Sequence, residues 1–162
     1  MSTSFQIVGA GQSLIIVDDD MLELVKTFKW RKTVKGYVIG RVDGTSTSLH
    51  RFILGIAPLD PIQVDHINGN RSDCRRANLR CCSSGQNAAN RRKINGTSSQ
   101  FKGVTYKRGR WEAQIKTNRK TLYLGRYVNE LEAARAYDEK ARELFGEFSW
   151  TNSDIARMER GK

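Results

Sequence analysis

The chain has 162 residues, a length that suits one ordinary domain or two small ones. It is 28% charged and 38% hydrophobic, and no apolar run is long enough to span a membrane. The N-terminus has no basic segment ahead of its apolar residues, as a secretory leader would have. We therefore expect an intracellular protein without membrane contact.

Positive charge is concentrated in the later part of the chain. Residues 1–65 contain seven Lys or Arg and seven Asp or Glu, so residues 66–162 carry the other 21 basic and 10 acidic residues and all of the net charge of +11. A basic balance confined to one part of a chain indicates a polyanionic partner, with solubility alone as the plainer alternative.

Three cysteines, Cys74, Cys81 and Cys82, form no C-x-x-C pair, and the adjacent two have a poor spacing for zinc. An odd number of thiols in an intracellular protein predicts reduced, partly buried side chains. We expect no zinc and assign these residues no chemistry.

The first 28 residues predict a β-hairpin followed by a helix. Apolar, β-branched runs within residues 5–17 are split by a Gly-Ala-Gly turn. Apolar positions at Met21, Leu24, Val25 and Phe28 then follow a helical period. Residues 18–20 are three consecutive aspartates, which we interpret as a cap and favourable charge for this helix rather than as a metal cluster.

Residues 30–61 predict a second hairpin, a short helix and a stiff connector. Residues 30–32 lead into a strand at 37–42, an Asp-Gly turn follows, and residues 46–49 return as the partner strand. Residues 50–55 are typical of a helix ended by glycine. The only two prolines follow, and they predict an extended segment before residue 62.

Residues 65–90 form a polar stretch with the signals of a strand, a loop, a second strand and a helix. Asp65 and His66 end a short apolar run, and an Asn-Gly turn opens the loop. Asn78 begins the second extended piece. Ser83 has the spacing of a capping box with Gln86, which predicts a helix start, and residues 87, 90 and 91 would share one face of that helix.

The residue types of this stretch suit phosphodiester hydrolysis. A histidine beside a carboxylate can take a proton from an attacking water. Carboxylate and amide oxygens are hard ligands that suit Mg²⁺, and such an ion can polarise a phosphodiester. A polar surface loop is the plainer alternative.

These residues resemble the HNH nuclease family, and most closely the phage-type homing endonucleases whose motif begins Asp-His. The resemblance implies a ββα-metal unit in which Asp65 is a metal ligand, His66 the general base and Asn78 the residue that fixes the histidine loop. It implies Asn87 as the second ligand, with Asn90 as the alternative on the same face. It also implies Mg²⁺, with Mn²⁺ as a substitute, and, for a phage gene, the cytoplasm of a bacterial host.

His50 and Arg51 are candidate active-site neighbours, because the order of elements before residue 65 also resembles those phage proteins. His50 is the only histidine besides His66. In one interpretation His50 lies near the active site or contacts phosphate. In the other it packs as an ordinary histidine in a helical turn. The sequence favours neither interpretation.

Beyond residue 100 the pattern changes to short basic strands and one helix. Strands are predicted at 101–106, 111–116 and 121–127. A helix begins after Asn129, where Glu132 has the capping-box spacing, and ends at Gly146. Residues 91–126 contain eleven Lys or Arg and one acidic residue, which favours a DNA-binding surface.

This later part, at residues 101–104, 111–115, 122–127, 132–138 and 150–152, resembles the AP2 DNA-binding domain. The resemblance implies that the face of a three-stranded sheet contacts DNA. Trp111 is a contact or a core residue, since it shares the strand parity of Ala113 and Ile115. The candidate DNA contacts, including the basic start of the preceding linker, are Arg91, Arg92, Lys102, Lys107, Arg110, Trp111, Gln114, Lys116 and Tyr123.

Together these patterns predict an α+β protein: an HNH ββα-metal nuclease domain, then a three-stranded antiparallel sheet packed on one helix. The predicted limits are 1–92 for the nuclease domain with its core at 62–92, 93–100 for a linker, 101–152 for the AP2-like domain and 153–162 for a tail. The predicted function is site-selective, Mg²⁺-dependent cleavage of double-stranded DNA, leaving 5′-phosphate and 3′-hydroxyl ends, by a monomer or a dimer. A non-cleaving DNA-binding protein is the first alternative, and an RNA-binding protein the second.

Overall fold

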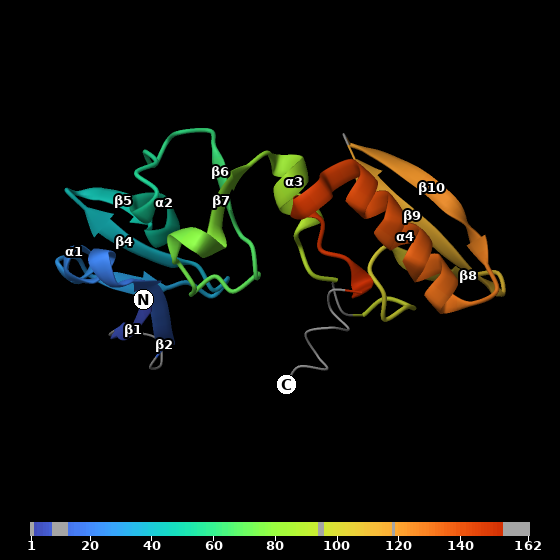
Figure 1. The fold of residues 1–162 in the computed structure, drawn as a ribbon, viewed down its shortest axis with the longest axis horizontal. Helices are drawn as coiled ribbons and strands as arrows, with labels where there is room; N and C mark the ends of the chain where they lie inside the picture. Colours follow the sequence, from blue (N-terminus) through green and yellow to red (C-terminus); the bar gives the residue numbers. More distant parts are fainter. Residues whose placement is uncertain (1, 8–12, 94–95, 118, 154–162) are drawn as a thin grey trace. The chain divides into compact units, whose positions relative to one another are not determined.

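The computed structural model describes residues 2–7, 13–93, 96–117 and 119–153. The chain forms two compact units, residues 1–83 and 84–162, which are described separately (Figure 1). Both units combine small antiparallel sheets with helices, which confirms the predicted α+β class.

The first unit contains seven described strands in three sheets, paired as β1–β2, β3–β4–β5 and β6–β7. The strands are β1 (Ser2–Ile7), β2 (Ser13–Asp18), β3 (Trp30–Lys32), β4 (Val38–Val42), β5 (Thr45–Ser48), β6 (Gln63–His66) and β7 (Leu79–Cys82). The helices are the 3₁₀ turn η1 (Asp19–Met21), α1 (Leu22–Lys26), α2 (Leu49–Ile53) and the 3₁₀ turn η2 (Arg76–Asn78).

These elements match the predicted hairpins and helices, with differences at their ends. The hairpin β1–β2 is confirmed; its Gly-Ala-Gly turn lies outside the described residues. Residues 30–32 form a strand of their own, β3, instead of a lead-in to β4. In the helical stripe Val25 is fully buried, but Leu24 is 49% exposed.

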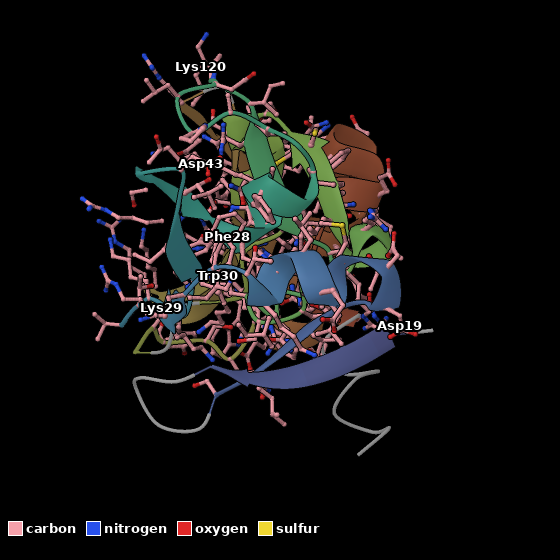
Figure 2. The ribbon with its side chains drawn as sticks, turned by 90° about the vertical axis from the view of Figure 1, so that its left-hand side faces the viewer. Asp19, Phe28, Lys29, Trp30, Asp43 and Lys120 are labelled. Carbon is pink, nitrogen blue, oxygen red and sulfur yellow. The ribbon has the colours of Figure 1, made fainter. Side chains whose placement is uncertain are left out.

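An apolar core holds the first unit together. Ile15, Val17, Val25, Val38 and Leu49 are fully buried, and each contributes roughly 1.5–3 kcal/mol by leaving water. The rings of Phe28, Trp30 and Phe52 pack against one another at this core, and the Trp30 indole donates to the Val25 carbonyl at 2.8 Å. Figure 2 shows Phe28 and Trp30 turned inward and Lys29 turned outward.

The acidic triplet 18–20 binds an arginine of the β6–β7 loop, which corrects its predicted role as a helix cap. Within the described residues Asp18 makes no side-chain cap to η1. Instead it accepts from the backbone N–H of Arg76 at 2.8 Å, and Asp20 accepts from the Arg76 guanidinium at 2.8 Å. The triplet therefore anchors the chain just before Asn78.

The second unit has one sheet and one long helix. Its elements are α3 (Ser84–Ala89), β8 (Val104–Lys107), β9 (Arg110–Thr117), β10 (Lys120–Tyr127), α4 (Glu130–Phe145) and the 3₁₀ turn η3 (Gly146–Phe148). The strand order is β10–β9–β8, and α4 lies along one face of the sheet (Figure 1). The predicted helix ends are confirmed: Asn129 accepts from the Leu131 N–H at 2.8 Å, and Gly146 is the C-cap with φ +52°.

Small residues bring α4 close to the sheet. Ala133, Ala134 and Ala141 are buried, and Tyr137 packs beside Gly103. A Cβ at Gly103 would lie 1.9 Å from the Tyr137 ring, and Gly103 has φ +75°, so only glycine fits there. The sequence predicts that this strand begins at residue 101, but because of the turn at Gly103 strand β8 begins at Val104.

The segment between the predicted domains is largely bonded to the second unit. Helix α3 contacts η3 and α4, so it is grouped with that unit although the predicted nuclease core extends to residue 92. Ser99 is buried and donates to Glu130 at 2.6 Å, and the Tyr106 N–H donates to Ser98 at 2.8 Å. Residues 94–95 and 154–162 lie outside the described residues.

Candidate active site and nucleic-acid face

Asp65 and His66 end strand β6, where the β6–β7 pairing places them opposite Arg80 and Leu79. Both side chains are buried, with 6% and 4% of their surface exposed. Successive strand residues point to opposite faces, and the contacts follow that rule: Asp65 pairs with Arg80, whereas His66 lies against His50.

Asn78 closes the loop that follows His66. Its amide nitrogen donates to the Asp73 carbonyl at 2.7 Å, and its amide oxygen accepts from the Asn68 N–H at 3.0 Å. The Ile67 N–H donates to the Asn78 carbonyl at 2.9 Å. These bonds join both ends of the loop to one buried residue, and the role expected of Asn78 at the active site stays a prediction.

Asp73 is a second anchor of the loop that the sequence analysis did not single out. Its side chain is 1% exposed and accepts from Arg75 at 2.6 and 2.8 Å and from the Asn68 amide at 2.9 Å. The hydrogen bonds from Arg75 hold the pKa of Asp73 below its ordinary value. The sequence signal that could have identified Asp73 is its position shortly before two arginines, Arg75 and Arg76.

His66 lies in a buried aromatic and thiol environment. The centroid of its ring is 5.0 Å from that of His50 and 6.4 Å from that of Tyr37, and Nε2 lies 3.9 Å from the Cys74 sulfur. Burial lowers the pKa of His66 to about 4; Asp65 opposes this shift and Arg71 adds to it. The imidazole is therefore neutral at neutral pH and can accept a proton.

His50 lies in α2 and against His66, and its role at the active site stays a prediction. It packs in the first turn of α2, where it is 8% exposed and its Nε2 lies 3.1 Å from the Ser48 hydroxyl, and it also contacts His66. Burial, and then His66 and Arg51, lower the pKa of His50 to about 3. Two neutral histidines thus lie together beside the hairpin.

Arg51 stabilises the connector between the two prolines. Its guanidinium donates to the carbonyls of Ile62 at 2.6 Å, Asp60 at 2.9 Å and Ala57. These bonds give Arg51 a structural role ahead of β6, and its place as an active-site neighbour stays a prediction.

Asp65 precedes His66 in β6, and its carboxylate lies on the opposite face of that strand from the imidazole. Its Oδ2 accepts from Arg80 Nη2 at 3.0 Å and Nε at 3.2 Å, and the Arg80 side chain is 12% exposed. A carboxylate is a hard oxygen donor that fits Mg²⁺, so Asp65 is chemically suited to hold a cation there. Arg80 was not predicted, although its register opposite Asp65 follows from a hairpin.

The two asparagines proposed as the second ligand lie in the second unit. Asn87 is in α3 and is half-buried, whereas Asn90 follows the last helical residue and is 6% exposed. The Asn90 N–H donates to the Gln86 carbonyl at 3.1 Å. Because α3 ends at Ala89, Arg91 does not share the helical face that the sequence predicts.

The cysteines are free thiols in different environments. Cys74 is buried, Cys82 half-buried and Cys81 exposed, so the prediction of partly buried thiols is wrong for Cys81. Burial raises the pKa of Cys74 to about 12 and that of Cys82 to about 11, which keeps both protonated at neutral pH.

The sheet face opposite α4 presents exposed polar and basic side chains. Gln114 and Tyr123 lie opposite each other on β9 and β10, and Lys116 lies opposite Thr121. Lys107 and Arg126 each lie 3.6 Å from Glu112, the one acid of this segment. The predicted contacts exposed on or beside this sheet are Lys107, Arg110, Gln114, Lys116 and Tyr123.

Two predicted DNA contacts turn inward instead. The Lys102 ammonium donates to the carbonyls of Ala89 at 2.5 Å and Trp150 at 3.4 Å, and burial lowers its pKa to about 8. Trp111 packs on the Val104–Ala133 cluster and on Tyr106, with ring centroids 4.7 Å apart. The core interpretation of Trp111 therefore holds, and Lys102 is bonded within the protein.

The basic start of the linker is exposed. Arg91 and Arg92 are both exposed, and the Arg92 guanidinium lies 5.0 Å from the centre of the Trp150 ring. A cation over an indole face is a favourable contact.

The hairpin thus combines a buried, neutral histidine, an aspartate that precedes it in β6, and a loop bonded to a buried asparagine. A model of the HNH endonuclease family matches residues 51–89. An uncharacterized HNH endonuclease of Acanthamoeba polyphaga mimivirus is 34% identical over 155 residues, covering 91% of this chain and 80% of the viral protein. The chain belongs to the HNH endonuclease family, and the protein is an HNH-type DNA endonuclease.

Part of the chain is similar to parts of two plant proteins. APETALA2-like protein 2 of Oryza sativa subsp. indica is 47% identical over 62 residues, and an AP2-like ethylene-responsive transcription factor of Arabidopsis thaliana is 46% identical over 74 residues. These matches cover 36% and 41% of this chain but only 14% and 21% of the plant proteins. No solved structure matches significantly. In the described part of the chain, no helix is long and apolar enough to cross a membrane.

Proposed function

We propose that the protein is a metal-dependent, site-selective endonuclease of the homing type that cuts double-stranded DNA to 5′-phosphate and 3′-hydroxyl ends. The observation that carries this proposal is the burial of neutral His66, which follows Asp65 at the end of β6 and precedes a loop that is bonded to buried Asn78. A polar surface loop would leave these side chains in water.

His66 is the general base of the proposed reaction. It takes a proton from water as the water oxygen attacks phosphorus, and the bond from phosphorus to the 3′-oxygen breaks. The neutral imidazole at neutral pH is the form that this step requires. Asn78 acts as a positioning residue, since it holds the loop behind His66.

We propose Mg²⁺ as the cofactor, with Mn²⁺ as a substitute. Asp65 would be one protein ligand and Asn87 the second; the half-burial of Asn87 favours it over buried Asn90. When bound, the ion supplies Lewis-acid polarisation of the phosphodiester and stabilises the leaving oxygen. Arg80, which already pairs with the Asp65 carboxylate, keeps that side chain oriented.

We propose the second unit as an AP2-type DNA-binding module. Its support is the exposed sheet face with Gln114, Lys116 and Tyr123, together with the exposed arginines 91 and 92. The basic side chains give sequence-independent affinity, and each neutralised phosphate adds about 0.9 to the log–log salt slope on duplex DNA. Because each chain carries one proposed active site, we propose that the protein acts as a monomer and nicks one DNA strand.

A random-sequence duplex library tests this function. The protein is incubated with the library with and without Mg²⁺, and new 5′-phosphate ends are sequenced, with His66→Ala as the control. Metal-dependent ends clustered at a motif support the proposal, and ends on one strand support a nicking monomer. Bound DNA without ends above the His66→Ala background would show a non-cleaving DNA-binding protein, and equal binding of RNA would oppose the DNA module.

A further inference from the structure

Helix α3 is short, and its C-terminal carbonyl is bonded by two groups from later in the chain. The Ala89 carbonyl accepts from Lys102 Nζ at 2.5 Å and from the Trp150 N–H at 3.3 Å. A helix of six residues is marginal by itself in water, so contacts outside the helix must hold it. Both donors belong to the AP2-like sheet region and its closing segment.

The Lys102 ammonium acts as a cap supplied from outside the helix. The last carbonyls of a helix lack partners within the helix, and a cation at that end also complements the helix dipole. Lys102 lies thirteen residues after Ala89, so the charge comes from another element, just before β8. Keeping this ammonium out of water is costly, which is reflected in its lowered pKa.

Lys102 is itself fixed in the second unit. Its backbone N–H donates to the Asn152 side chain at 2.7 Å, and the Asn152 amide donates to the Lys102 carbonyl at 3.2 Å and to Asp138 at 2.9 Å. Asp138 is buried in α4. A continuous set of hydrogen bonds therefore runs from α4 through Asn152 and Lys102 to the end of α3.

We propose that Lys102 is a positioning residue for cleavage, because by capping α3 it holds the helix that carries Asn87. This proposal rests on the proposed ligand role of Asn87. It assigns Lys102 a role different from the DNA contact that its position in the AP2 pattern implies.

The test compares Lys102→Met with Lys116→Met in the full chain. Methionine keeps the apolar part of the lysine side chain and removes the donor and the charge. Hydrogen exchange measures the protection of residues 84–90, anisotropy in EDTA measures DNA affinity, and cleavage at saturating DNA measures the Mg²⁺ requirement. Lys116 is an exposed control on the proposed DNA face.

We expect Lys102→Met to accelerate exchange in α3, leave the protection of β9 unchanged, and raise the half-saturating Mg²⁺ concentration by about tenfold, as supporting residues behind metal ligands usually do. DNA affinity in EDTA should stay close to wild type. Lys116→Met should weaken DNA binding and leave α3 protection unchanged. Weaker DNA binding by Lys102→Met with unchanged α3 exchange and an unchanged Mg²⁺ requirement would overturn the proposal.

Two further variants separate the possible failures. If Lys102→Met unfolds the whole unit, Lys102→Arg serves as the second variant, because it retains a charged donor. Lys102→Arg should then keep residues 84–90 protected from exchange. Loss of that protection in Lys102→Arg would oppose the capping role. Asn87→Ala tests the ligand assignment by itself. If Asn87→Ala leaves the Mg²⁺ requirement unchanged, the ligand role fails, while the exchange measurement still decides whether Lys102 holds α3.

Discussion

The rings of His50 and His66 lie edge to face in the first unit, with their centroids 5.0 Å apart and an interplanar angle of 78°. Both are buried, and both have a pKa lowered well below 6.5. Neither ring can therefore become charged without weakening the packing of α2 against the hairpin. This pair joins the proposed base to a helix that precedes it by thirteen residues.

The histidine pair predicts that acid destabilises the first unit before the carboxylates titrate. Folded pKa values below the unfolded value of 6.5 mean that the unfolded chain binds more protons. Stability is therefore complete above pH 6.5 and is lost as pH falls toward 4. Between pH 7 and pH 5 we expect a loss of at most about 2 kcal/mol for each histidine.

Denaturant unfolding at the two pH values measures this loss. Trp30 reports on the first unit when Trp111 and Trp150 are replaced by phenylalanine, since the chain has three tryptophans. In that background the free energy of unfolding of His50→Gln should change with pH only by the amount that His66 causes. A wild-type stability that is equal at pH 7 and pH 5 would contradict the burial of neutral histidines.

Removing the Asn78 side chain should loosen the loop behind His66. Asn78→Ala leaves the buried Asp73 carbonyl and the Asn68 N–H without their present partner, a loss of about 1–3 kcal/mol. Cleavage at saturating DNA should fall while DNA affinity is retained. Asn78→Asp keeps the acceptor for the Asn68 N–H but places an oxygen against the Asp73 carbonyl, so it should not restore cleavage. Equal cleavage by wild type and Asn78→Ala would remove the positioning role.

The metal ligands are separable by titration with Mg²⁺. Asp65→Asn and Asn87→Ala should each raise the half-saturating Mg²⁺ concentration, because each removes a proposed oxygen ligand. Asn90→Ala is the matched control on the same segment, and it should leave that concentration near wild type. A shift for Asn90→Ala and none for Asn87→Ala would reassign the second ligand.

The sheet face predicts a defined change in salt dependence. Lys116→Gln removes one exposed charge, so the log–log slope of duplex binding against salt should fall by about 0.9. Lys140→Gln changes a lysine on α4 that pairs with Glu143, and should leave the slope unchanged. Equal slopes for all three proteins would place DNA elsewhere on the chain.

Local patterns were sufficient to predict the hairpin β1–β2 and both ends of α4, because each depends on residues close in sequence. The Asn129 cap and the Gly146 stop illustrate this. Pairings between distant residues could not be read in the same way. The aspartate triplet had a suitable partner 56 residues later in Arg76, and a capping pattern alone could not reveal it.

Lys102 shows the same limit at the proposed DNA face. Its position in a basic, AP2-like strand predicts an outward contact, but the fold places its ammonium on the Ala89 carbonyl. Only the three-dimensional position of α3 beside that strand reveals this bond. His50 is similar, since its closeness to His66 depends on how α2 packs and not on the spacing of the two residues.

The most direct test of the central claim is the single-turnover cleavage rate of wild type and His66→Ala at the site recovered from the library, with Mg²⁺ and saturating DNA. We expect His66→Ala to cut at least about 100-fold more slowly, as loss of a general base usually does, with DNA affinity close to wild type. Cleavage by His66→Ala at the wild-type rate would contradict the assignment of His66 as the base.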